Sequence, residues 1–358
     1  MRQSINRLIA KLTGSLRPFP GFLRAARWNS SFDSFRRFNL RAGLAMLASA
    51  ILIGAPGGAG AASATLTVQA GQPGVTISSN LFGVFFEEIS SAGDGGLYAE
   101  LVRNRSFEDN TNNPDYWTFV TSGTAAGTMS LDTSLPLSPS NRISLSLALT
   151  NGAGTVGAAN SGYWGIPISS GASYNLGFYA RCSSNFQSSI IASLESSNGY
   201  VVYVASSVTG LTTGWQHFTV TLTSGASDPA ARLVLRIFQP GTVWLDFVSL
   251  FPAQTFMNRS NGLRPDLANL LVNLRPSFVR FPGGAWVDGA GVPNFYNWEV
   301  TVGNLSDRQP RWDLWGYMVD NGLGYHEYLQ MCEDLGAENA RILRCVQNDR
   351  PVAFTGIS

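Results

Sequence analysis

Residues 278–284, which read Phe-Val-Arg-Phe-Pro-Gly-Gly, constrain the fold more than any other part of the chain. The first four residues have strand character and the last three form a turn. Upstream, Pro265 suits the first turn of a helix, and Pro276 ends that helix. Apolar residues recur between them at helical spacing, namely Leu267, Leu270, Leu271 and Leu274. A helix that leads through a short turn into a short strand is half of a βα repeat, so this segment predicts an α/β fold.

Arg280 is the one charged residue of the predicted strand and lies near its C-terminal end. In a (β/α)8 barrel the C-terminal ends of the strands face the active site. The pattern alone is equally consistent with an arginine that forms a salt bridge at a domain edge.

A second helix is predicted downstream, because Tyr325, Tyr328, Leu329, Cys332 and Leu335 form an apolar face and Gly336 suits a C-cap. The long loop between the predicted strand and this helix suits a ligand-binding rim. Asp288, Glu299 and His326 are candidate functional residues of that rim. His326 at the start of a helix is more typical of a packed or capping residue than of a general base.

A different pattern occupies residues 116–252, where short alternating runs are separated by glycine, serine and asparagine. The runs include residues 143–147, 174–180, 190–194, 200–204, 215–222, 232–238 and 243–250. Strands at this spacing predict a β-sandwich or jelly roll. The run lies between the first predicted barrel strand and the first long helix, so it is an insertion in a βα loop. Such loops form the catalytic face of a barrel.

Composition excludes several classes of function. Charged residues make up 13% of the chain, and beyond residue 63 there are 15 basic and 22 acidic residues, a net charge of −7. This balance argues against nucleic acid and other polyanionic partners. Cys182, Cys332 and Cys345 are an odd, widely spaced set without metal-ligand spacing, so we expect neither a metal site nor a disulfide framework. Residues 93–96 suit a turn better than a phosphate-binding loop, and no cofactor is implied.

The first 63 residues have the three parts of a secretory signal. A basic segment precedes an apolar stretch at residues 44–53 and a small-residue run that allows cleavage after Ala61 or Ala62. We therefore expect a signal peptide of about 62 residues and a secreted or periplasmic protein. The alternatives are an arginine-rich organelle transit peptide and, if the segment is not cleaved, a membrane anchor. Residues 54–60 are too rich in glycine and proline to favour a spanning helix.

Several longer blocks carry a family resemblance. Near the N-terminus they are Leu-Phe-Gly-Val-Phe-Phe-Glu-Glu at 81–88, then 93–101 and 104–108; further on they are 278–284, Asn297-Trp298, Val302-Gly303 and 320–328. These blocks, which span residues 75–110 and 255–338 in order, resemble glycoside hydrolase family 51. This family comprises the α-L-arabinofuranosidases, which remove arabinose from hemicellulose. The resemblance implies an α/β plus all-β fold: an incomplete (β/α)8 barrel with an inserted jelly-roll β-sandwich.

The resemblance also implies roles for individual residues. Residues 81–89 would form the first barrel strand, and Glu87 at its end would hold substrate hydroxyls, whereas Glu88 is interpreted as a solvated loop charge. Arg280 would pair with the catalytic nucleophile and keep it ionised, because a nearby cation favours the charged carboxylate. Asp288 is a weaker substrate-binding candidate. Ala285 stands where some family members have asparagine, so that substrate contact is missing or supplied elsewhere. Residues 65–69 would form an edge strand.

The sandwich resembles a carbohydrate-binding module found beside xylan-degrading enzymes. Sugar binding needs exposed aromatic faces and a few polar groups, and Tyr163, Trp164 and Trp215 are the candidates. The alternative is that these aromatic side chains belong to the core, as we expect for Trp244.

Retaining glycosidases use two carboxylic acids, a proton donor and a nucleophile. In the resembled family both are glutamates on later barrel strands, the donor in an Asn-Glu pair, and the sequence contains no Asn-Glu pair. We therefore expect no catalytic residue in this chain and place both glutamates beyond its end. Residues 340–346 make a poor third strand, so we interpret the chain as a fragment that is inactive alone.

These patterns divide the chain into five parts. They are a targeting segment at 1–63, an N-terminal strand and first barrel unit at 64–110, a carbohydrate-binding-like sandwich at 111–253, a barrel continuation at 254–338 and a divergent tail at 339–358. The leading hypothesis is retaining hydrolysis of terminal non-reducing α-L-arabinofuranosyl residues in arabinoxylan or another arabinose-containing polysaccharide. The alternative is a non-catalytic carbohydrate-binding protein. A purely structural sandwich would explain none of the family blocks, and the sequence does not define an oligomeric state.

Overall fold

The computed structural model describes residues 64–72 and 74–341, and the chain divides into two units, Met1–Pro73 and Gly74–Ser358. The predicted export signal, Cys345 and residues 342–346 lie outside the described residues. In the first unit, the described residues 64–72 are exposed and contain only a turn. The edge strand predicted at 65–69 is therefore wrong. Its alternating pattern lacks a neighbouring strand among the described residues, and a β-strand needs one to satisfy its backbone hydrogen bonds. No helix of the described residues is long and apolar enough to cross a membrane.

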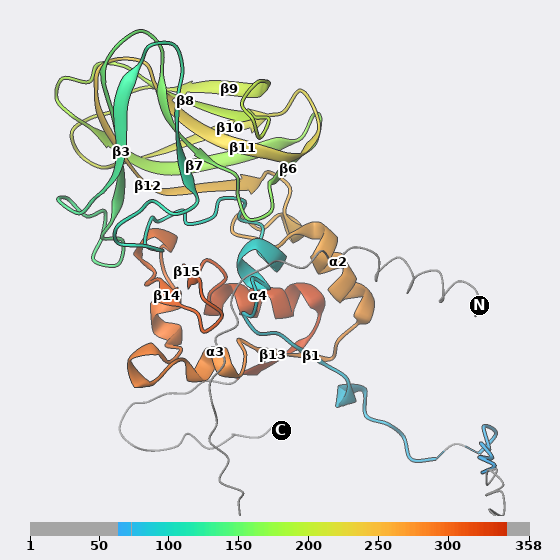
Figure 1. The fold of residues 1–358 in the computed structure, drawn as a ribbon. Helices are drawn as coiled ribbons and strands as arrows, with labels where there is room; N and C mark the ends of the chain where they lie inside the picture. Colours follow the sequence, from blue (N-terminus) through green and yellow to red (C-terminus); the bar gives the residue numbers. More distant parts are fainter. Residues whose placement is uncertain (1–63, 73, 342–358) are drawn as a thin grey trace, which may run out of the picture. The chain divides into compact units, whose positions relative to one another are not determined.

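Two antiparallel sheets form a β-sandwich in the second unit, as the alternating runs predict (Figure 1). One sheet has the order β10-β7-β12-β4-β3, and the other has the order β2-β5-β11-β8-β9 with β6 also paired to β11. The strands are β2 Trp117–Thr121, β3 Ala126–Asp132, β4 Ser144–Asn151, β5 Val156–Asn160, β6 Ile166–Ile168, β7 Ser173–Cys182, β8 Ile190–Glu195, β9 Val202–Val208, β10 Gln216–Thr223, β11 Asp228–Ile237 and β12 Gly241–Pro252.

The core of the sandwich follows from the period of two along each strand. Alternate side chains of β4 and β7 point inward from one sheet and meet those of β8 and β11 from the other; all of these are buried: Leu145, Leu147, Leu176, Phe178, Ala192, Leu194, Leu233 and Leu235. The opposite face of β7 carries Asn175, Tyr179 and Arg181, which places polar and aromatic groups on the outside of that sheet.

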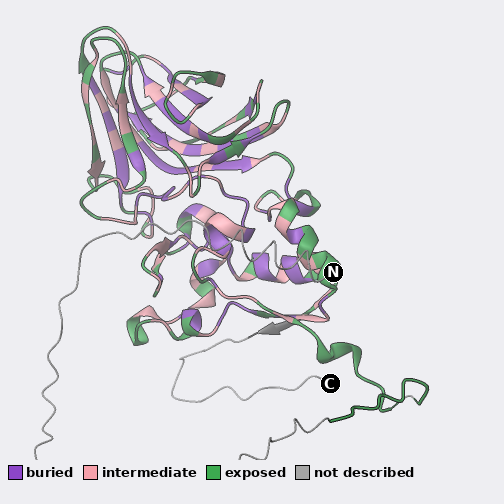
Figure 2. Cartoon of the chain, turned by 45° about the vertical axis from the view of Figure 1, so that its right-hand side comes forward, coloured by how far each residue is buried: buried purple, intermediate pink, exposed green. Residues whose placement is uncertain are grey.

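A smaller α/β region surrounds the sandwich insertion in sequence. Its three strands, β1 (Val84–Phe85), β13 (Phe278–Phe281) and β16 (Glu338–Arg341), form a parallel sheet with the order β1-β13-β16. The helices are α2 (Pro265–Leu274), the short α3 (Ala285–Asp288) and α4 (Tyr325–Leu335). Figure 2 shows buried residues along α4, and they include Tyr328, Met331 and Cys332.

The local signals in this region identify most of its elements. Strand β13 and helices α2 and α4 are confirmed, and α4 ends at Gly336, whose φ of 64° is the left-handed C-cap that glycine adopts readily. The first strand is shorter than the predicted 81–89, because only its neighbour β13 pairs with it and Ser79–Leu81 form a 3-10 turn, η1. A third strand, β16, is present, but it begins at Glu338 rather than in the apolar stretch 340–346.

The loop elements complete the region. They are η2 (Gly93–Leu97), η3 (Phe256–Asn258), η4 (Val292–Asn294), η5 (Trp298–Thr301), η6 (Leu305–Asp307) and the antiparallel pair β14 (Arg311–Trp312) and β15 (Met318–Val319).

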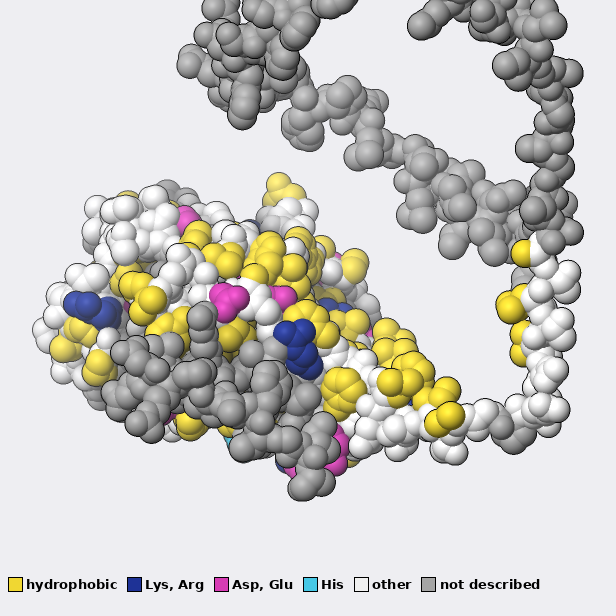
Figure 3. Space-filling model, turned by 90° about the horizontal axis from the view of Figure 1, so that it is seen from below, with side chains coloured by type: hydrophobic (Ala, Val, Ile, Leu, Met, Phe, Trp, Pro, Cys, Tyr) yellow, Lys and Arg dark blue, Asp and Glu magenta, His cyan; other side chains and the backbone are white. Residues whose placement is uncertain are grey.

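The described residues show an open three-stranded sheet and not a barrel. In Figure 3, the face that carries β1 and β13 displays hydrophobic side chains between a few charged ones. Apolar residues of this region remain exposed, among them Phe82, Phe85, Leu270 and Leu274. Part of the apolar surface of the α/β region therefore lacks a packing partner within the described residues.

Candidate functional site

The ends of β1 and β13 bring together the two residues that the family resemblance singles out. The strands are parallel neighbours with Val84 opposite Val279 and Phe85 opposite Arg280. The backbone amide of Phe86 continues the pairing by donating to the carbonyl of Arg280 at 2.9 Å. Glu87 is the second residue after β1, so both side chains arise at the C-terminal edge of the same sheet.

The Glu87 carboxylate is held by the loop that follows β13. Its Oε1 accepts hydrogen bonds from the backbone amides of Gly284 at 2.9 Å and Trp286 at 2.8 Å, and Oε2 accepts none among the described residues. A Cβ on Gly283, whose φ is 153°, would lie 2.6 Å from Cγ of Glu87. The Pro-Gly-Gly turn therefore admits the glutamate by leaving out a side chain. The result is an oriented carboxylate with one oxygen available to a ligand.

Arg280 and Asp288 lie on either side, along the chain, of the loop whose amides bind this carboxylate. The Arg280 side chain is exposed, and its guanidinium lies 4.5 Å from the ring centroid of Phe85, a cation–π contact. Asp288 is the last residue of α3 and is exposed. The arginine is therefore accessible at the sheet edge.

The prediction that Glu88 is a solvated loop charge is wrong, because this residue is only 2% exposed. Its Oε1 accepts a hydrogen bond from the hydroxyl of Tyr317 at 2.9 Å, and Oε2 accepts one from the amide of Asp94 at 3.3 Å. The Tyr317 hydroxyl in turn accepts from the amide of Ser91 at 2.8 Å. Burial raises the pKa of Glu88 to about 8, in part opposed by these hydrogen bonds. Successive glutamates thus have different environments, one facing the sheet edge and one buried behind it.

The wall beside the carboxylate is aromatic and cationic. Trp286 is buried, and the guanidinium of Arg311 stacks on its ring at 3.8 Å while donating a hydrogen bond to its carbonyl. Burial lowers the pKa of Arg311 to about 10. Tyr296 packs against Trp286 with ring centroids 6.2 Å apart.

Two of the module's aromatic candidates lie against the α/β region. Trp164 is 74% exposed, and its Nε1 donates to the carbonyl of Gly95 at 3.2 Å. Tyr163 is half-buried and packs on Gly95, where a Cβ would come within 2.4 Å of its ring. Trp164 therefore offers an accessible aromatic face, whereas Tyr163 mainly fills the space above a glycine turn.

The third candidate belongs to a stacked cluster. Trp215 is half-buried, its Nε1 donates to the carbonyl of Leu135 at 3.0 Å, and Arg181 lies 5.3 Å from its ring centroid. Arg181 also lies 3.9 Å from the ring of Trp244. Trp244 is half-buried on the outer face of β12 rather than fully in the core. The prediction of a core position for Trp244 is wrong because its side chain alternates outward and packs on Arg181.

Sequence reasoning overlooked Tyr317 and the burial of Glu88. Tyr317 is 229 positions from Glu88 in the chain, so no local pattern links them. Sequence reasoning also assigned no role to Tyr179 and His217. The alternation of side chains along β7 and β10 places both on the outer face of one sheet.

Comparison with known proteins defines the class. Residues 270–352 match the family model described as the alpha-L-arabinofuranosidase 1 domain, and residues 99–242 match a carbohydrate binding domain. The chain thus combines a region homologous to glycoside hydrolases with an inserted region homologous to carbohydrate-binding domains. More particularly, it is a homologue of the family 51 α-L-arabinofuranosidases.

The individual relatives support this assignment. The chain is 36% identical to alpha-L-arabinofuranosidase 1 of Arabidopsis thaliana over 285 residues, which cover 76% of this chain and 41% of the relative. It is 37% identical to an extracellular exo-alpha-L-arabinofuranosidase of Streptomyces chartreusis over 76% of this chain and 33% of that protein. A solved structure of an arabinose-bound family 51 α-L-arabinofuranosidase matches with 35% identity and a TM-score of 0.70, covering 75% of this chain and 45% of that one. The chain therefore spans less than half the length of these relatives.

Proposed function

We propose that the chain derives from an enzyme that hydrolyses terminal non-reducing α-L-arabinofuranosyl residues of arabinose-containing polysaccharides by a retaining mechanism, and that it supplies part of that enzyme's substrate site. The observation that carries the proposal is the Glu87 carboxylate, fixed by two backbone amides at the C-terminal edge of a parallel sheet. That edge is where ligands bind in barrels built from parallel strands. The proposal includes a (β/α)8 barrel in which β1, β13 and β16 are consecutive strands.

In this proposal each residue acts through its own chemistry. Glu87 accepts hydrogen bonds from substrate hydroxyls through Oε2, because Oε1 is already occupied by Gly284 and Trp286. Arg280 places a cation beside the nucleophile and favours its ionised form. Asp288 contributes a further hydrogen-bond acceptor. The nucleophile and the proton donor are glutamates of later barrel strands, and the Asn-Glu pair that would contain the donor is absent from this sequence.

The role of Glu87 is tested by sugar binding to the full chain. A chemical-shift titration with methyl α-L-arabinofuranoside should give saturable shifts, and Glu87→Gln should weaken binding about tenfold, a loss of about 1.4 kcal/mol. The amide replaces one acceptor oxygen by an N–H donor, so it cannot serve both the loop amides and the sugar. Glu333→Gln, an exposed substitution on α4, is the matched control. Equal affinities of the Glu87 variant and the wild type for the sugar would show that Glu87 does not bind it.

We propose further that the 358-residue chain by itself does not turn over substrate. Double displacement requires two carboxylic acids about 5–5.5 Å apart, and the family's donor context is absent. No release of nitrophenol from p-nitrophenyl α-L-arabinofuranoside is expected. Turnover that survives purification and is lost with Glu87→Gln would contradict this point while supporting the site.

A second candidate function is non-catalytic sugar binding by the sandwich. It is supported by the match of residues 99–242 to a carbohydrate binding domain and by the exposed ring of Trp164. Pull-down on insoluble arabinoxylan should retain the wild type and lose the Trp164→Ala, Trp215→Ala double variant. Equal retention of both proteins would leave the aromatic pair without a role.

We also propose export of the protein, because residues 1–63 combine a basic segment, an apolar stretch and small residues. N-terminal sequencing of protein from the medium should begin near Ala62 or Ser63. Secreted protein that retains Met1 would contradict cleavage.

A further inference from the structure

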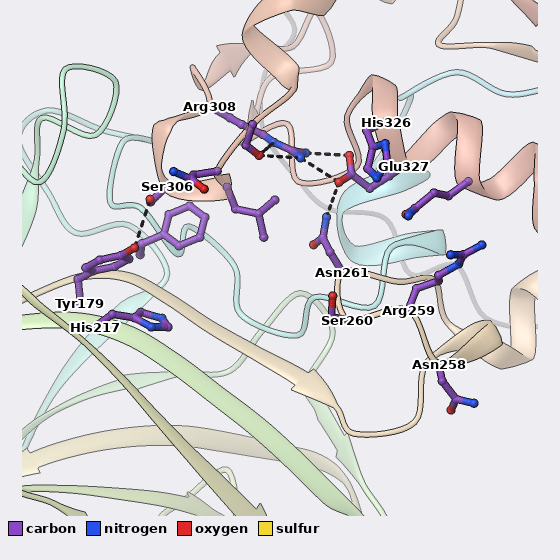
Figure 4. A pocket seen from close by; sticks show the side chains of 15 residues that line it. Tyr179, His217, Asn258, Arg259, Ser260, Asn261, Ser306, Arg308, His326 and Glu327 are labelled. Atoms are coloured by element: carbon purple, nitrogen blue, oxygen red, sulfur yellow. Dashed lines mark hydrogen bonds and ion pairs between the residues drawn. The ribbon is translucent and has the colours of Figure 1, made fainter.

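A polar cleft lies between the outer face of the β10-β7-β12-β4-β3 sheet and the loops of the α/β region (Figure 4). Its volume is about 790 Å³, within the range of small-molecule sites. Figure 4 shows Tyr179 and His217 projecting from the sandwich strands, with Arg308, His326 and Glu327 on the opposite wall. Both the sandwich and the α/β region therefore contribute to this cleft.

The cleft continues along the sheet. A second hollow of about 560 Å³ runs beside β7 and β10, and both hollows are lined by His217, Asn258, Arg259 and Ser260. Because these residues border both spaces, the two form one groove. An elongated ligand suits such a groove better than a compact one.

The charged residues of the groove are already paired. Arg308 and Glu327 form a buried ion pair at 2.8 Å, and Arg259 binds Asp334 at 2.7 Å. Burial lowers the pKa of His217, which keeps its imidazole neutral at pH 7. An acidic ligand would find no unpaired cation among these groups, so the lining favours a neutral ligand.

The remaining groups match the chemistry of sugars. The rings of Tyr179 and His217 lie 4.7 Å apart at 46° and present apolar surface to the groove. The side chains of His326, Asn258 and Ser260 are exposed and make no hydrogen bond within the described part of the chain. An aromatic surface beside hydrogen-bond donors and acceptors is suited to a sugar ring, which has an apolar face and a rim of hydroxyls.

We propose that this groove binds a neutral oligosaccharide several units long, the backbone of the polysaccharide whose arabinofuranosyl side groups enter the site at Glu87. The inference rests on the proposed function for the identity of the polysaccharide, but it concerns different residues. Tyr179 and His217 stack against a ring of the backbone, and the loop of Asn258 and Ser260 with His326 binds its hydroxyls.

The test is calorimetric titration of the full chain with xylohexaose, which carries no arabinose. Tyr179→Ala and His217→Ala should each weaken binding about tenfold or more, whereas Tyr179→Phe, which keeps the ring, should stay within about threefold. Tyr200→Ala is the matched control, because Tyr200 is an exposed tyrosine in the β8–β9 hairpin of the other sheet. Thermal unfolding of each variant separates lost binding from lost folding.

The outcomes distinguish this inference from the proposed function. Binding of xylohexaose that is insensitive to Tyr179→Ala, or no binding at all, would overturn the groove while leaving the Glu87 titration with methyl α-L-arabinofuranoside unaffected. Tighter binding of a galacturonate oligomer than of xylohexaose would also overturn it, since the groove would then favour an acidic chain. If Tyr179→Ala loses xylohexaose binding while the wild type binds no arabinofuranoside, the proposed oligosaccharide groove would be supported and the proposed arabinofuranosyl site at Glu87 would be refuted.

Discussion

Glu88 is the residue whose environment has the clearest consequence for stability. Its pKa is raised to about 8 by burial, whereas the ordinary value is 4.5. The folded state therefore binds a proton more tightly than the unfolded state between these values, and stability falls as the pH rises through this window. Each pKa unit corresponds to about 1.4 kcal/mol, so the loss by pH 8 is on the order of several kcal/mol. The effect is complete only above the folded pKa.

Replacing Glu88 by glutamine should flatten this dependence. The amide keeps an acceptor for the Tyr317 hydroxyl and has no charge to bury. Urea unfolding at pH 5 and pH 8 should show a smaller difference in the free energy of unfolding for Glu88→Gln than for the wild type. An unchanged difference would assign the pH dependence to other carboxyls, such as Asp94, whose pKa is also raised by burial.

At the scale of elements, the start of α4 depends on one buried ion pair. Glu327 accepts from the amide of Gly324 at 3.0 Å and so caps the helix, and it binds Arg308 of the rim loop at 2.8 Å. Glu327→Ala would leave the Arg308 guanidinium buried and unpaired, which costs about 3–5 kcal/mol. Denaturant unfolding at pH 7 measures this loss.

Glu333 provides the comparison on the same helix. Its carboxylate is 74% exposed and lies 3.3 Å from Arg259, so Glu333→Ala should cost less than about 1 kcal/mol. Similar losses for Glu327→Ala and Glu333→Ala would mean that burial does not strengthen the Glu327 pair.

The same scale shows what the sequence could predict. Helix α4 and strand β13 are encoded by adjacent residues, through apolar spacing, a proline stop and a glycine cap, and both were predicted from those signals. Whether residues 65–69 form a strand, and how long β1 is, depend on the presence of a neighbouring strand to pair with. A local sequence pattern does not show whether such a neighbour exists. The burial of Glu88 depends on Tyr317 in a distant loop, and so the sequence interpretation treated it as a surface charge. Glu87 and Arg280 were selected through a family resemblance, and their positions on neighbouring strands follow from the parallel pairing of β1 and β13.

At the scale of the molecule, Arg105 joins the sandwich to the α/β region. Its buried guanidinium lies 2.9 Å from Glu100 and 2.5 Å from Asp320 of the rim loop. Glu100 in turn accepts from the amide of Leu250 at 2.9 Å and from the hydroxyl of Ser249 at 2.5 Å, both on β12. Arg105 thus connects the segment after β1 with β12, through Glu100, and with the loop between β13 and α4, through Asp320. The sandwich has its own large core, whereas the α/β region has a smaller one and exposes apolar surface.

This difference predicts how the two regions unfold. Arg105→Met removes the cation and leaves the buried carboxylate of Glu100 and the partly buried carboxylate of Asp320 without their partner, at a cost of about 3–5 kcal/mol that falls on the junction and the α/β region. Differential scanning calorimetry should therefore show an early transition for the α/β region and a later one near the wild-type temperature for the sandwich. Arg103→Met is the matched control, since Arg103 is half-buried and stacks on Tyr116, and it should keep the wild-type profile. A single transition for the Arg105 variant, merely shifted to lower temperature, would show that the regions are coupled by their wider packing and not by this arginine.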